Sequence, residues 1–425
     1  MNALIIRHGR VVDPANQIDE ARDVAVVDGR IADLRDIPPE AKPEEVDAKG
    51  LVVCPGLIDM HVHLREPGRA DQETIASGTR AAAHGGFTTV VCMPNTKPPA
   101  DTAGTVEFIK AHARDKGVVH VVPTGCITIG SQGEQLAEIG SLKRAGVAAI
   151  TDDGHCVQNN EIMRRAIEYA KMFSLPVLDH CQDANLSASG VVNEGYWSTA
   201  LGLHGWPAIA EEIMVSRDCM LAELADWKLH IQHVSTAGSV RIVREARDRG
   251  VRVSAEVTPH HLALADETVK SYDTNLKMNP PLRSARDVEA LRQGIRDGVI
   301  EVLASDHAPH CSYEKEVEFD YAPFGIVGLE TELGIFATEL VHKGVISLSR
   351  MIAMLTINPA RILQLDAGTL GKGAVADITL MDPDREWVVN RDEFASLSRN
   401  TPFHGWKLKG KAVMTIVAGR IVWRE

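Results

Sequence analysis

The sequence predicts an α/β protein: a (β/α)₈ TIM-like barrel with a small β domain formed by both chain termini. Three observations support this prediction. Residues 55–365 alternate apolar, β-rich runs with amphipathic helical stretches, the runs number eight, and short β-type runs occupy both ends of the chain. Apolar strands joined by helices form a parallel sheet covered on both faces, and eight such units close into a barrel.

The predicted small domain is a β-sandwich that comprises residues 1–54 and 366–425. Both ends of the chain contain short β-type runs separated by turn residues. They are ALIIRHGRVVD and DVAVVDGRIADL near the start, and ADITLMDP and AVMTIVAGRIVWRE near the end. Asp28 and Gly29 lie between two of these runs, and this dipeptide favours a tight hairpin turn. We therefore expect strands from the two termini to share one domain beside the barrel.

The predicted barrel strands follow one another through the middle of the chain. They are 56–63, 87–94, 118–125, 147–153, 176–182, 229–235, 251–260 and 299–309. Amphipathic stretches lie between them, for example 73–85, 161–173 and 238–250, with apolar residues at helical spacing. A doubly wound open sheet is the alternative. The phosphate-binding fingerprint GxGxxG is absent after the first run, which favours the barrel.

Composition and charge exclude several classes of partner. The 425-residue chain has a net charge of -13 and no block of Lys and Arg, so we expect neither a nucleic-acid partner nor an anionic membrane surface. No run approaches the ~18–20 apolar residues that span a bilayer, and we find no secretory signal. The seven cysteines form no CxxC pair, which indicates reduced thiols in a cytoplasmic protein.

Imidazole and carboxylate side chains end six of the eight runs, where a barrel carries its chemistry. They are His61, His63, Asp152, Asp153, His180, His233, His260, His261, Asp306, His307 and His310. Such donors without thiolate pairs suit Zn²⁺ or a similar ion in a catalytic site. Residues i and i+2 of a strand face the same side, so His61 and His63 can both face the interior. A metal there lowers the pKa of its water, and Asp306 can accept the proton.

This pattern resembles the amidohydrolase superfamily. The segment NPARILQLDAGTLGKGAVADITLMDP (358–383) is similar to the passage by which cyclic amidohydrolases leave the barrel and re-enter their β-sandwich. DMHVHLREPG, GGFTTVVCMPNT, TDDG, EVTPHHLAL, MNPPLR and ASDHAPH together resemble the dihydroorotases of the long, bacterial type. Allantoinases, dihydropyrimidinases or hydantoinases, and isoaspartyl dipeptidases are the competing neighbours.

Arg65 and Asn95 favour the dihydroorotases among these families. Allantoinase-like sequences generally carry an uncharged residue at the position of Arg65. Dihydroorotate and N-carbamoyl-L-aspartate bear a carboxylate that allantoin and plain dihydropyrimidines lack. An arginine fork pairs with a carboxylate through charge-assisted, often bidentate hydrogen bonds.

The resemblance implies the reversible cyclisation of N-carbamoyl-L-aspartate to L-dihydroorotate plus water in de novo pyrimidine (UMP) biosynthesis. It implies attack by a metal-bound hydroxide, with Asp306 as general base and acid. The implied metal ligands are His61, His63, Asp153, His180, His233 and Asp306, and the implied substrate contacts are His63, Arg65, Asn95, Asn279, His310, Phe324 and Gly325. Two zinc ions per subunit are expected, with one ion as the alternative. The metal count is open because this chain has no lysine where many relatives carry a bridging carboxylated lysine.

Two features near these residues leave alternatives open. Adjacent strand residues face opposite sides, so only one of Asp152 and Asp153 can enter the site from a regular strand, and family spacing implies Asp153. We expect His260, His261 and His307 around the ligands rather than among them. The charged segment 311–322 is either a solvated excursion or a lid over the substrate.

The resemblance also implies that the chain forms a homodimer. It further implies a complex with aspartate transcarbamoylase. One rival function is that of a related cyclic amidohydrolase acting on another ring. The other is an inactive homologue retained as a structural partner of the transcarbamoylase. An inactive copy would be expected to lose metal ligands, and this chain keeps the whole set.

Overall fold

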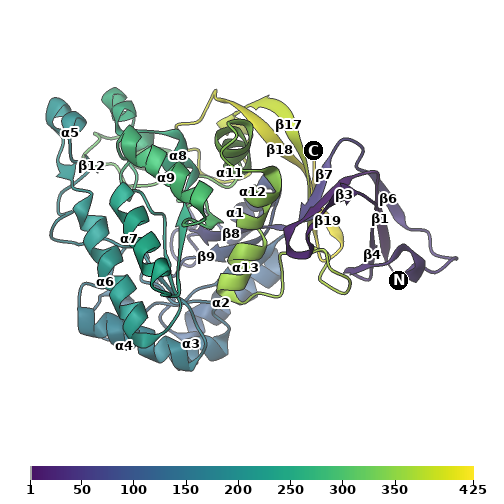
Figure 1. Ribbon diagram of the computed structural model, residues 1–425, viewed down its shortest axis with the longest axis horizontal. Helices are drawn as coiled ribbons and strands as arrows, with labels where there is room; N and C mark the ends of the chain where they lie inside the picture. The colour runs from purple at the N-terminus through teal and green to yellow at the C-terminus, as the bar shows by residue number, and fades with distance from the viewer. Residues whose placement is uncertain (1) are drawn as a thin grey trace.

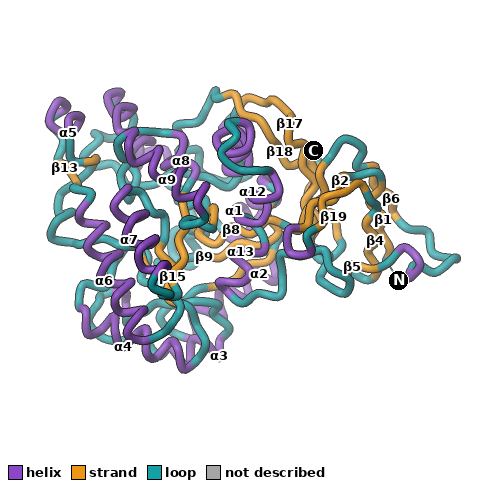
Figure 2. The backbone as a smooth tube through the Cα atoms, in the orientation of Figure 1, coloured by secondary structure: helices purple, strands orange, loops and turns teal. Residues whose placement is uncertain are grey.

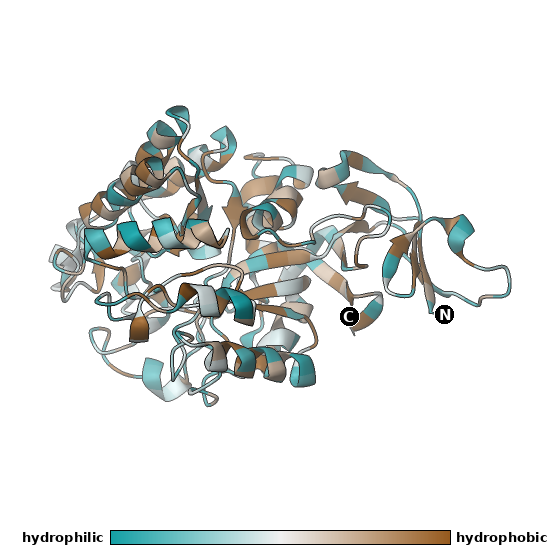
Figure 3. Ribbon diagram, turned by 90° about the horizontal axis from the view of Figure 1, so that it is seen from below, coloured by the Kyte–Doolittle hydropathy of each residue, from teal (hydrophilic) through white to brown (hydrophobic). Residues whose placement is uncertain are grey.

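The structure is a computed structural model that describes residues 2–425. A barrel of parallel strands surrounded by helices lies on one side of the molecule, and smaller sheets that hold both chain ends lie on the other (Figure 1). The strands of the barrel interior are mostly hydrophobic, whereas many surrounding helices alternate hydrophilic and hydrophobic residues (Figure 3). No helix within residues 2–425 is long and apolar enough to cross a membrane.

Among the described residues, seven strands form the barrel in two parallel groups. The first group is β10 (His120–Pro123), β9 (Phe87–Cys92) and β8 (Leu57–Val62), and the second is β11 (Val177–Asp179), β14 (Leu229–Ile231), β15 (Val253–Val257) and β16 (Val302–Leu303). Single backbone bridges join the groups, from Ile150 to Gly125 and Val177 on one side and from Val62 to His307 on the other. These bridges close the ring, and the predicted barrel is confirmed.

The predicted strand at 147–153 is not a regular strand in the structure. Only Ile150 forms bridges, one to each neighbouring strand position. The chain leaves the ladder just afterwards, because the Asp152 carboxylate accepts hydrogen bonds from the backbone N–H groups of Ile127 (2.8 Å) and Thr128 (3.1 Å). The run therefore occupies the place of the fourth strand without its full hydrogen-bonding pattern.

Helices cover the outside of the barrel. The longer ones are α1 (Ile75–Gly85), α2 (Ala103–Lys116), α3 (Ile139–Ala145), α4 (Asn160–Met172), α6 (Ile209–Ala225), α7 (Ala237–Asp248), α9 (Ala285–Asp297), α12 (Leu348–Met354) and α13 (Ile357–Leu363). Shorter helices are α5 (Tyr196–Leu201), α8 (Pro259–Ala263), α10 (Ser312–Lys315) and α11 (Glu332–Phe336), and β12 (Val192–Asn193) pairs with β13 (Gly205–Trp206). Thr74, Thr102 and Thr236 cap α1, α2 and α7 by accepting a backbone N–H, which fixes where these helices begin.

Two sheets lie beside the barrel (Figure 2). One has the order β5-β4-β1-β6, with β1 (Ala3–Arg7), β4 (Val24–Val27), β5 (Arg30–Ala32) and β6 (Glu44–Asp47). The other has the order β19-β18-β17-β7-β2-β3, with β2 (Arg10–Asp13), β3 (Ile18–Ala21), β7 (Val52–Pro55), β17 (Ile378–Val388), β18 (Lys407–Val417) and β19 (Arg420–Arg424). The predicted turn at Asp28 and Gly29 joins β4 to β5, with both residues at the positive φ that such a turn requires. Strands from both ends of the chain thus share the six-stranded sheet.

Between β17 and β18 the chain leaves this sheet and reaches the barrel. In this crossing segment, residues 389–406, Val389, Phe394 and Phe403 are buried in one cluster with barrel residues such as Leu264 and Ile326. The predicted division into 1–54 and 366–425 against 55–365 stays a prediction. The contacts show that part of the range 366–425 packs on the loops that follow the barrel strands.

Candidate active site

Six of the predicted polar side chains meet at the carboxyl ends of the barrel strands, with Asp153 at their centre. Its Oδ1 lies 3.4 Å from His61 Nε2, 3.5 Å from His180 Nδ1 and 3.8 Å from His233 Nε2. Its Oδ2 lies 3.5 Å from His63 Nε2. One carboxylate is therefore close to four imidazoles that come from three different strand ends.

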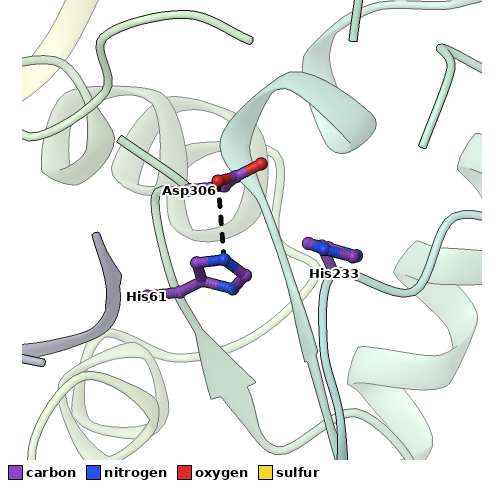
Figure 4. Close-up of side chains that lie close together, drawn as sticks. All are labelled: His61, His233 and Asp306. Atoms are coloured by element: carbon purple, nitrogen blue, oxygen red, sulfur yellow. Dashed lines mark ion pairs between the residues drawn. The ribbon is translucent and has the colours of Figure 1, made fainter. Parts of the chain in front are cut away.

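Asp306 is the sixth member of this cluster. Its Oδ1 lies 3.0 Å from His63 Nε2 and 3.5 Å from His61 Nε2. Figure 4 shows Asp306 above the His61 ring, with His233 beside them. Asp306 (φ 49°) and His233 (φ 30°) both have positive φ, which non-glycine residues rarely adopt. Strain of this kind persists where surrounding contacts fix the backbone, as they do here.

Three of the rings have one nitrogen held from behind, so the other nitrogen faces the cluster. His61 Nδ1 lies 2.7 Å from Glu256 Oε1, and His63 Nδ1 lies 2.9 Å from Asn95 Oδ1. His180 Nε2 lies 2.9 Å from Gln182 Oε1. An acceptor behind a neutral ring takes the proton of the nitrogen that it contacts, so the facing nitrogen keeps the lone pair that a metal ion would take. The facing nitrogen of His180, Nδ1, lies 2.8 Å from His233 Nε2.

Sequence reasoning missed Glu256 and Gln182. Glu256 is fully buried on β15, where its second oxygen lies 3.0 Å from His230 Nε2. A lone acidic residue inside the apolar run VRVSAEV was the signal that could have identified it. Gln182, two residues after His180, carried no such signal, because glutamine is common where a strand runs into a loop.

The cluster has the electrostatics of a cation site. Burial alone would raise the pKa of Asp153, but His61, His180 and His233 hold it well below its usual value. Burial alone would lower the pKa of His61, but Asp153, Asp306 and Glu256 raise it well above its usual value. The carboxylates therefore stay ionised. Their negative charges stabilise a positive charge placed between them.

The donors of the cluster fit a metal ion. His61 Nε2 and Asp153 Oδ1 are buried without a hydrogen-bond partner among the described residues, which is costly unless another group binds them. Ligand atoms ~2.1 Å from a tetrahedral ion are about 3.4 Å apart, and the observed separations between donor atoms range from 2.8 to 3.8 Å around this value. Donors group as His61, His63 and Asp153, as Asp153, His180 and His233, and as His61, His233 and Asp306.

Asp152 points away from this cluster and towards the loop at Ile127 and Thr128. Burial raises its pKa to about 6. The structure therefore separates the adjacent aspartates as strand alternation predicts, with Asp153 on the side of the histidines.

The neighbouring histidines lie around the cluster. His261 Nε2 lies 3.1 Å from the Pro280 carbonyl, and His307 Nδ1 accepts the Gly328 N–H at 3.1 Å. His260 is buried, and burial lowers its pKa to about 4, so it is neutral. None of the three belongs to a donor group within residues 2–425.

A cavity of about 310 Å³ adjoins the cluster. All seven predicted substrate contacts line it: His63, Arg65, Asn95, Asn279, His310, Phe324 and Gly325. Asp153, His180 and Asp306 also line it, and Gly154, Ala308 and Pro323 complete the wall without having been predicted. The cavity has the size of a small-molecule site and opens directly onto the donor atoms.

Arg65 is a cation without a carboxylate partner in the part of the chain described. Its Nε donates to the Pro309 carbonyl at 3.2 Å, and it takes part in no ion pair there. Burial lowers its pKa to about 10, so it remains charged at neutral pH. Arg65 thus gives the wall a charged donor for a small anion. Asn279 Oδ1 in the same wall is buried without a hydrogen-bond partner among residues 2–425, so it can accept an N–H of a bound ring.

Asn400, in the crossing segment, holds two loops of the cavity wall together. Its Oδ1 accepts the His310 N–H at 3.1 Å, and its Nδ2 donates to the carbonyls of Ala308 (3.1 Å) and Gly325 (3.2 Å). Its backbone carbonyl accepts the Val327 N–H at 3.0 Å. No sequence signal pointed to Asn400, because it lies about 75 to 90 residues from the groups that it binds.

The segment 311–322 is anchored beside this wall. Lys315 is buried, and its Nζ donates to the carbonyls of Pro323 (2.7 Å) and Thr274 (3.2 Å). Phe319 is also buried, whereas Tyr313 and Tyr321 are exposed. The structure describes the segment in this anchored arrangement, and the two alternatives, a solvated excursion and a lid, stay predictions.

Comparison with known proteins identifies the family. A family model described as dihydro-orotase-like matches residues 50–239, and one described as amidohydrolase family matches residues 225–423. The dihydroorotase of Pelotomaculum thermopropionicum is 56% identical over 99% of both chains. The dihydroorotase of Pelobacter propionicus is 52% identical over 99% of this chain and 100% of its own. The chain belongs to the dihydroorotase family. The resemblance inferred from the motifs is therefore confirmed.

Solved structures with other names share the fold of this dihydroorotase-family chain. The L-hydantoinase (dihydropyrimidinase) from Arthrobacter aurescens has a TM-score of 0.89 at 27% identity, over 100% of this chain and 96% of its own. The dihydropyrimidinase from Brevibacillus agri has a TM-score of 0.87 at 25% identity, over 99% and 95%. Enzymes named for different substrates thus share this barrel, and the substrate has to be argued from the residues of the wall.

Proposed function

We propose that the chain is a dihydroorotase, which interconverts N-carbamoyl-L-aspartate and L-dihydroorotate in pyrimidine biosynthesis. One observation carries this proposal: Arg65, a cation without an ion-pair partner among residues 2–425, lies in the wall of the same 310 Å³ cavity as the donor cluster. A ring that bears a carboxylate fits both features of the cavity. Its carboxylate can pair with Arg65 while its amide lies at the donor cluster. The dihydroorotases that align with almost the whole chain support the same substrate.

We propose two zinc ions per subunit as the metal content. His61, His63 and Asp153 would hold one ion, Asp153, His180 and His233 would hold the other, and Asp306 would complete the ligand set. Asp153 belongs to both groups, which supports its role as the shared ligand. When bound, the ions supply Lewis-acid chemistry that polarises a carbonyl and lowers the pKa of water.

The residues of the chain position the substrate and move the proton. Arg65, with Asn95 and Asn279 beside it, binds and orients the carboxylate so that the ring amide carbonyl faces Asp306. His310 is neutral, because burial and the charge of Arg65 lower its pKa to about 3, and it keeps the Phe324 carbonyl in place at 2.7 Å.

Asp306 is the proposed general base and acid. Burial alone would raise its pKa, but His61 and His63 hold it well below its usual value, so it is ionised and able to accept a proton. In hydrolysis it takes a proton from the attacking water and passes it to the ring nitrogen as the amide C–N bond breaks. In cyclisation it takes the proton of the ureido nitrogen as this nitrogen attacks the side-chain carboxyl, and passes the proton to a carboxyl oxygen. That oxygen leaves as water after taking a second proton from solvent.

A substrate panel tests this proposal. Protein loaded with zinc should turn over L-dihydroorotate and N-carbamoyl-L-aspartate, measured by chromatography in both directions. Allantoin, dihydrouracil and hydantoin are the comparison substrates, since they lack the carboxylate. Turnover of one of these rings without turnover of dihydroorotate would overturn the proposal in favour of a related cyclic amidohydrolase. Metal without turnover of any compound would favour an inactive structural partner.

For the assembly we propose a cytoplasmic homodimer that also forms a complex with aspartate transcarbamoylase. Membership of the dihydroorotase family supports this assembly. Gel filtration with and without the transcarbamoylase tests it, and co-elution of the two proteins is the expected result.

A further inference from the structure

The outward face of α6 is apolar, unlike that of its neighbour α7. Ile209, Ile213, Met220 and Leu224 have exposed fractions of 46%, 44%, 64% and 64%, and within 209–225 the one other exposed side chain is Glu223. By contrast, α7 exposes charged side chains such as Arg241 and Glu245. Single exposed apolar residues are ordinary, but four along one helix face mark a surface that another surface covers.

These four residues, which we call the α6 stripe, are arranged symmetrically along the helix. The midpoint of the stripe lies between Ser216 and Arg217. Ile213 and Met220 are equally far from this midpoint, and so are Ile209 and Leu224. Ser216 itself lies in the stripe at helical spacing and is small, so a second helix can approach closely there.

This symmetry is what a two-fold contact between identical helices requires. In an isologous interface each residue pair occurs twice, so an antiparallel pairing of two α6 helices places Ile213 against Met220 of the second copy. Ile209 then faces Leu224 of the second copy. The stripe is about 22 Å long, from 15 residue steps of about 1.5 Å, so the contact extends over four helical turns.

The charges beside the stripe are also complementary to themselves. A groove of about 320 Å³ runs between α6 and α7, lined by Glu212 and Arg241 towards the start of the helices and by Arg249 towards their end. Arg249 forms an ion pair with Glu223 at 3.3 Å. Arg241 forms an ion pair with Glu245, which also lines the groove, at 2.9 Å. Antiparallel pairing brings Glu212 of one copy towards Arg249 of the other, and Arg241 towards Glu245 of the other, so acidic side chains meet basic ones across the contact.

The position of α6 leaves room for a second copy. Figures 1 and 2 show α6 at the edge of the barrel opposite the small sheets and both chain ends. Two molecules can therefore meet through α6 without contact between their small sheets.

We propose that the α6 stripe is the interface through which two copies of this chain form an antiparallel, two-fold dimer. The inference rests on the homodimer of the proposed function and assigns it a surface and a register.

A charge-pairing experiment tests both the surface and the register. Sedimentation velocity with a dilution series measures the dimer dissociation constant of the full-length wild type and its variants. Ile213→Glu and Met220→Lys each place an unpaired charge in the apolar contact and should raise this constant about 100-fold, since such burial costs several kcal/mol. The double variant puts the two new charges opposite each other across the two-fold axis and should recover most of the affinity. Leu34→Glu, at an exposed apolar residue in the 3-10 turn that follows β5, is the matched control.

Several results would overturn the inference. A monomeric wild type, or single variants as tightly dimeric as the wild type, would reject the α6 stripe as the interface. A double variant that is no tighter than the single variants would reject the antiparallel register. If the chain is monomeric and binds the transcarbamoylase, and Met220→Lys abolishes that binding, the stripe belongs to that partner instead. Dihydroorotate turnover is assayed separately, so an inactive but dimeric protein contradicts only the proposed activity.

Discussion

Replacing Asn400 by alanine should weaken substrate binding while leaving the metal site intact. The side chain makes three hydrogen bonds to the cavity wall, to the His310 N–H and to the carbonyls of Ala308 and Gly325, at 3.1 to 3.2 Å. Asn400→Ala removes all three partners at a position that is 5% exposed. None of the six proposed metal ligands bonds to this side chain in the part of the chain described.

The magnitude follows from the groups that are left unpaired. A buried polar group without its partner costs about 1–3 kcal/mol, and the smaller value applies where a loop can relax. Three groups at about 1 kcal/mol each give about 3 kcal/mol, or roughly 100-fold in an equilibrium constant. Part of this cost also destabilises the folded chain. We therefore expect kcat/KM to fall between about 10-fold and about 100-fold, mainly through KM.

The assay measures hydrolysis of L-dihydroorotate over a range of substrate concentrations, with metal content determined by elemental analysis of the same sample. Asn390→Ala is the matched control in the same segment, because Asn390 caps the turn at Arg391–Glu393 and bonds to no cavity residue among those described. The control should keep the wild-type kcat/KM. A kcat/KM of Asn400→Ala within about threefold of the wild type would refute the positioning role. So would a loss of metal in proportion to the loss of activity.

Three further predictions concern the site and its wall. Asp153→Asn should leave less than one equivalent of metal by elemental analysis. The reason is that the two groups proposed to hold an ion, one with His63 and one with His180, share this carboxylate; two retained equivalents would contradict the shared role. Arg65→Lys should raise KM for dihydroorotate about 100-fold in steady-state assays, since the bidentate fork is lost; Arg80→Lys on α1 is the control, and an unchanged KM would contradict the assignment. Burial lowers the pKa of Lys315 to about 7 from an unfolded value of 10.5, so stability should be lowest below pH 7 and rise towards pH 10. Urea unfolding at pH 6.5 and 9 should show this rise in the wild type and a smaller one in Lys315→Met; equal slopes would show that Lys315 is not responsible.

Sequence periodicity predicted the parts of the site at the ends of the barrel strands. Two-residue alternation placed His61, on β8, and His63, just after it, on the same side, and the same alternation predicted that Asp152 and Asp153 point in different directions. The rule that barrels carry their chemistry at strand ends then brought His180, His233 and Asp306 to the same place. These features are local, so a short stretch of sequence contains the information.

The residues that escaped prediction act over long distances or break a local rule. Glu256 supports His61 from another strand, and Asn400 reaches the wall from a segment that follows the barrel in the chain. Pairings of this kind depend on how distant segments fold together, which no periodicity encodes. The irregular fourth strand has a local cause that was equally hidden, because the Asp152 side chain competes with the ladder for backbone N–H groups.

The crossing segment has a consequence for the order in which this protein becomes active during translation. All six proposed ligands have been synthesised once residue 306 leaves the ribosome, but Asn400 emerges almost one hundred residues later. Until then the loops at His310 and Gly325 lack the three side-chain hydrogen bonds of Asn400. The substrate wall is therefore the last part of the site to be completed in chain order, because the bonds from Asn400 form only after every proposed ligand has been synthesised.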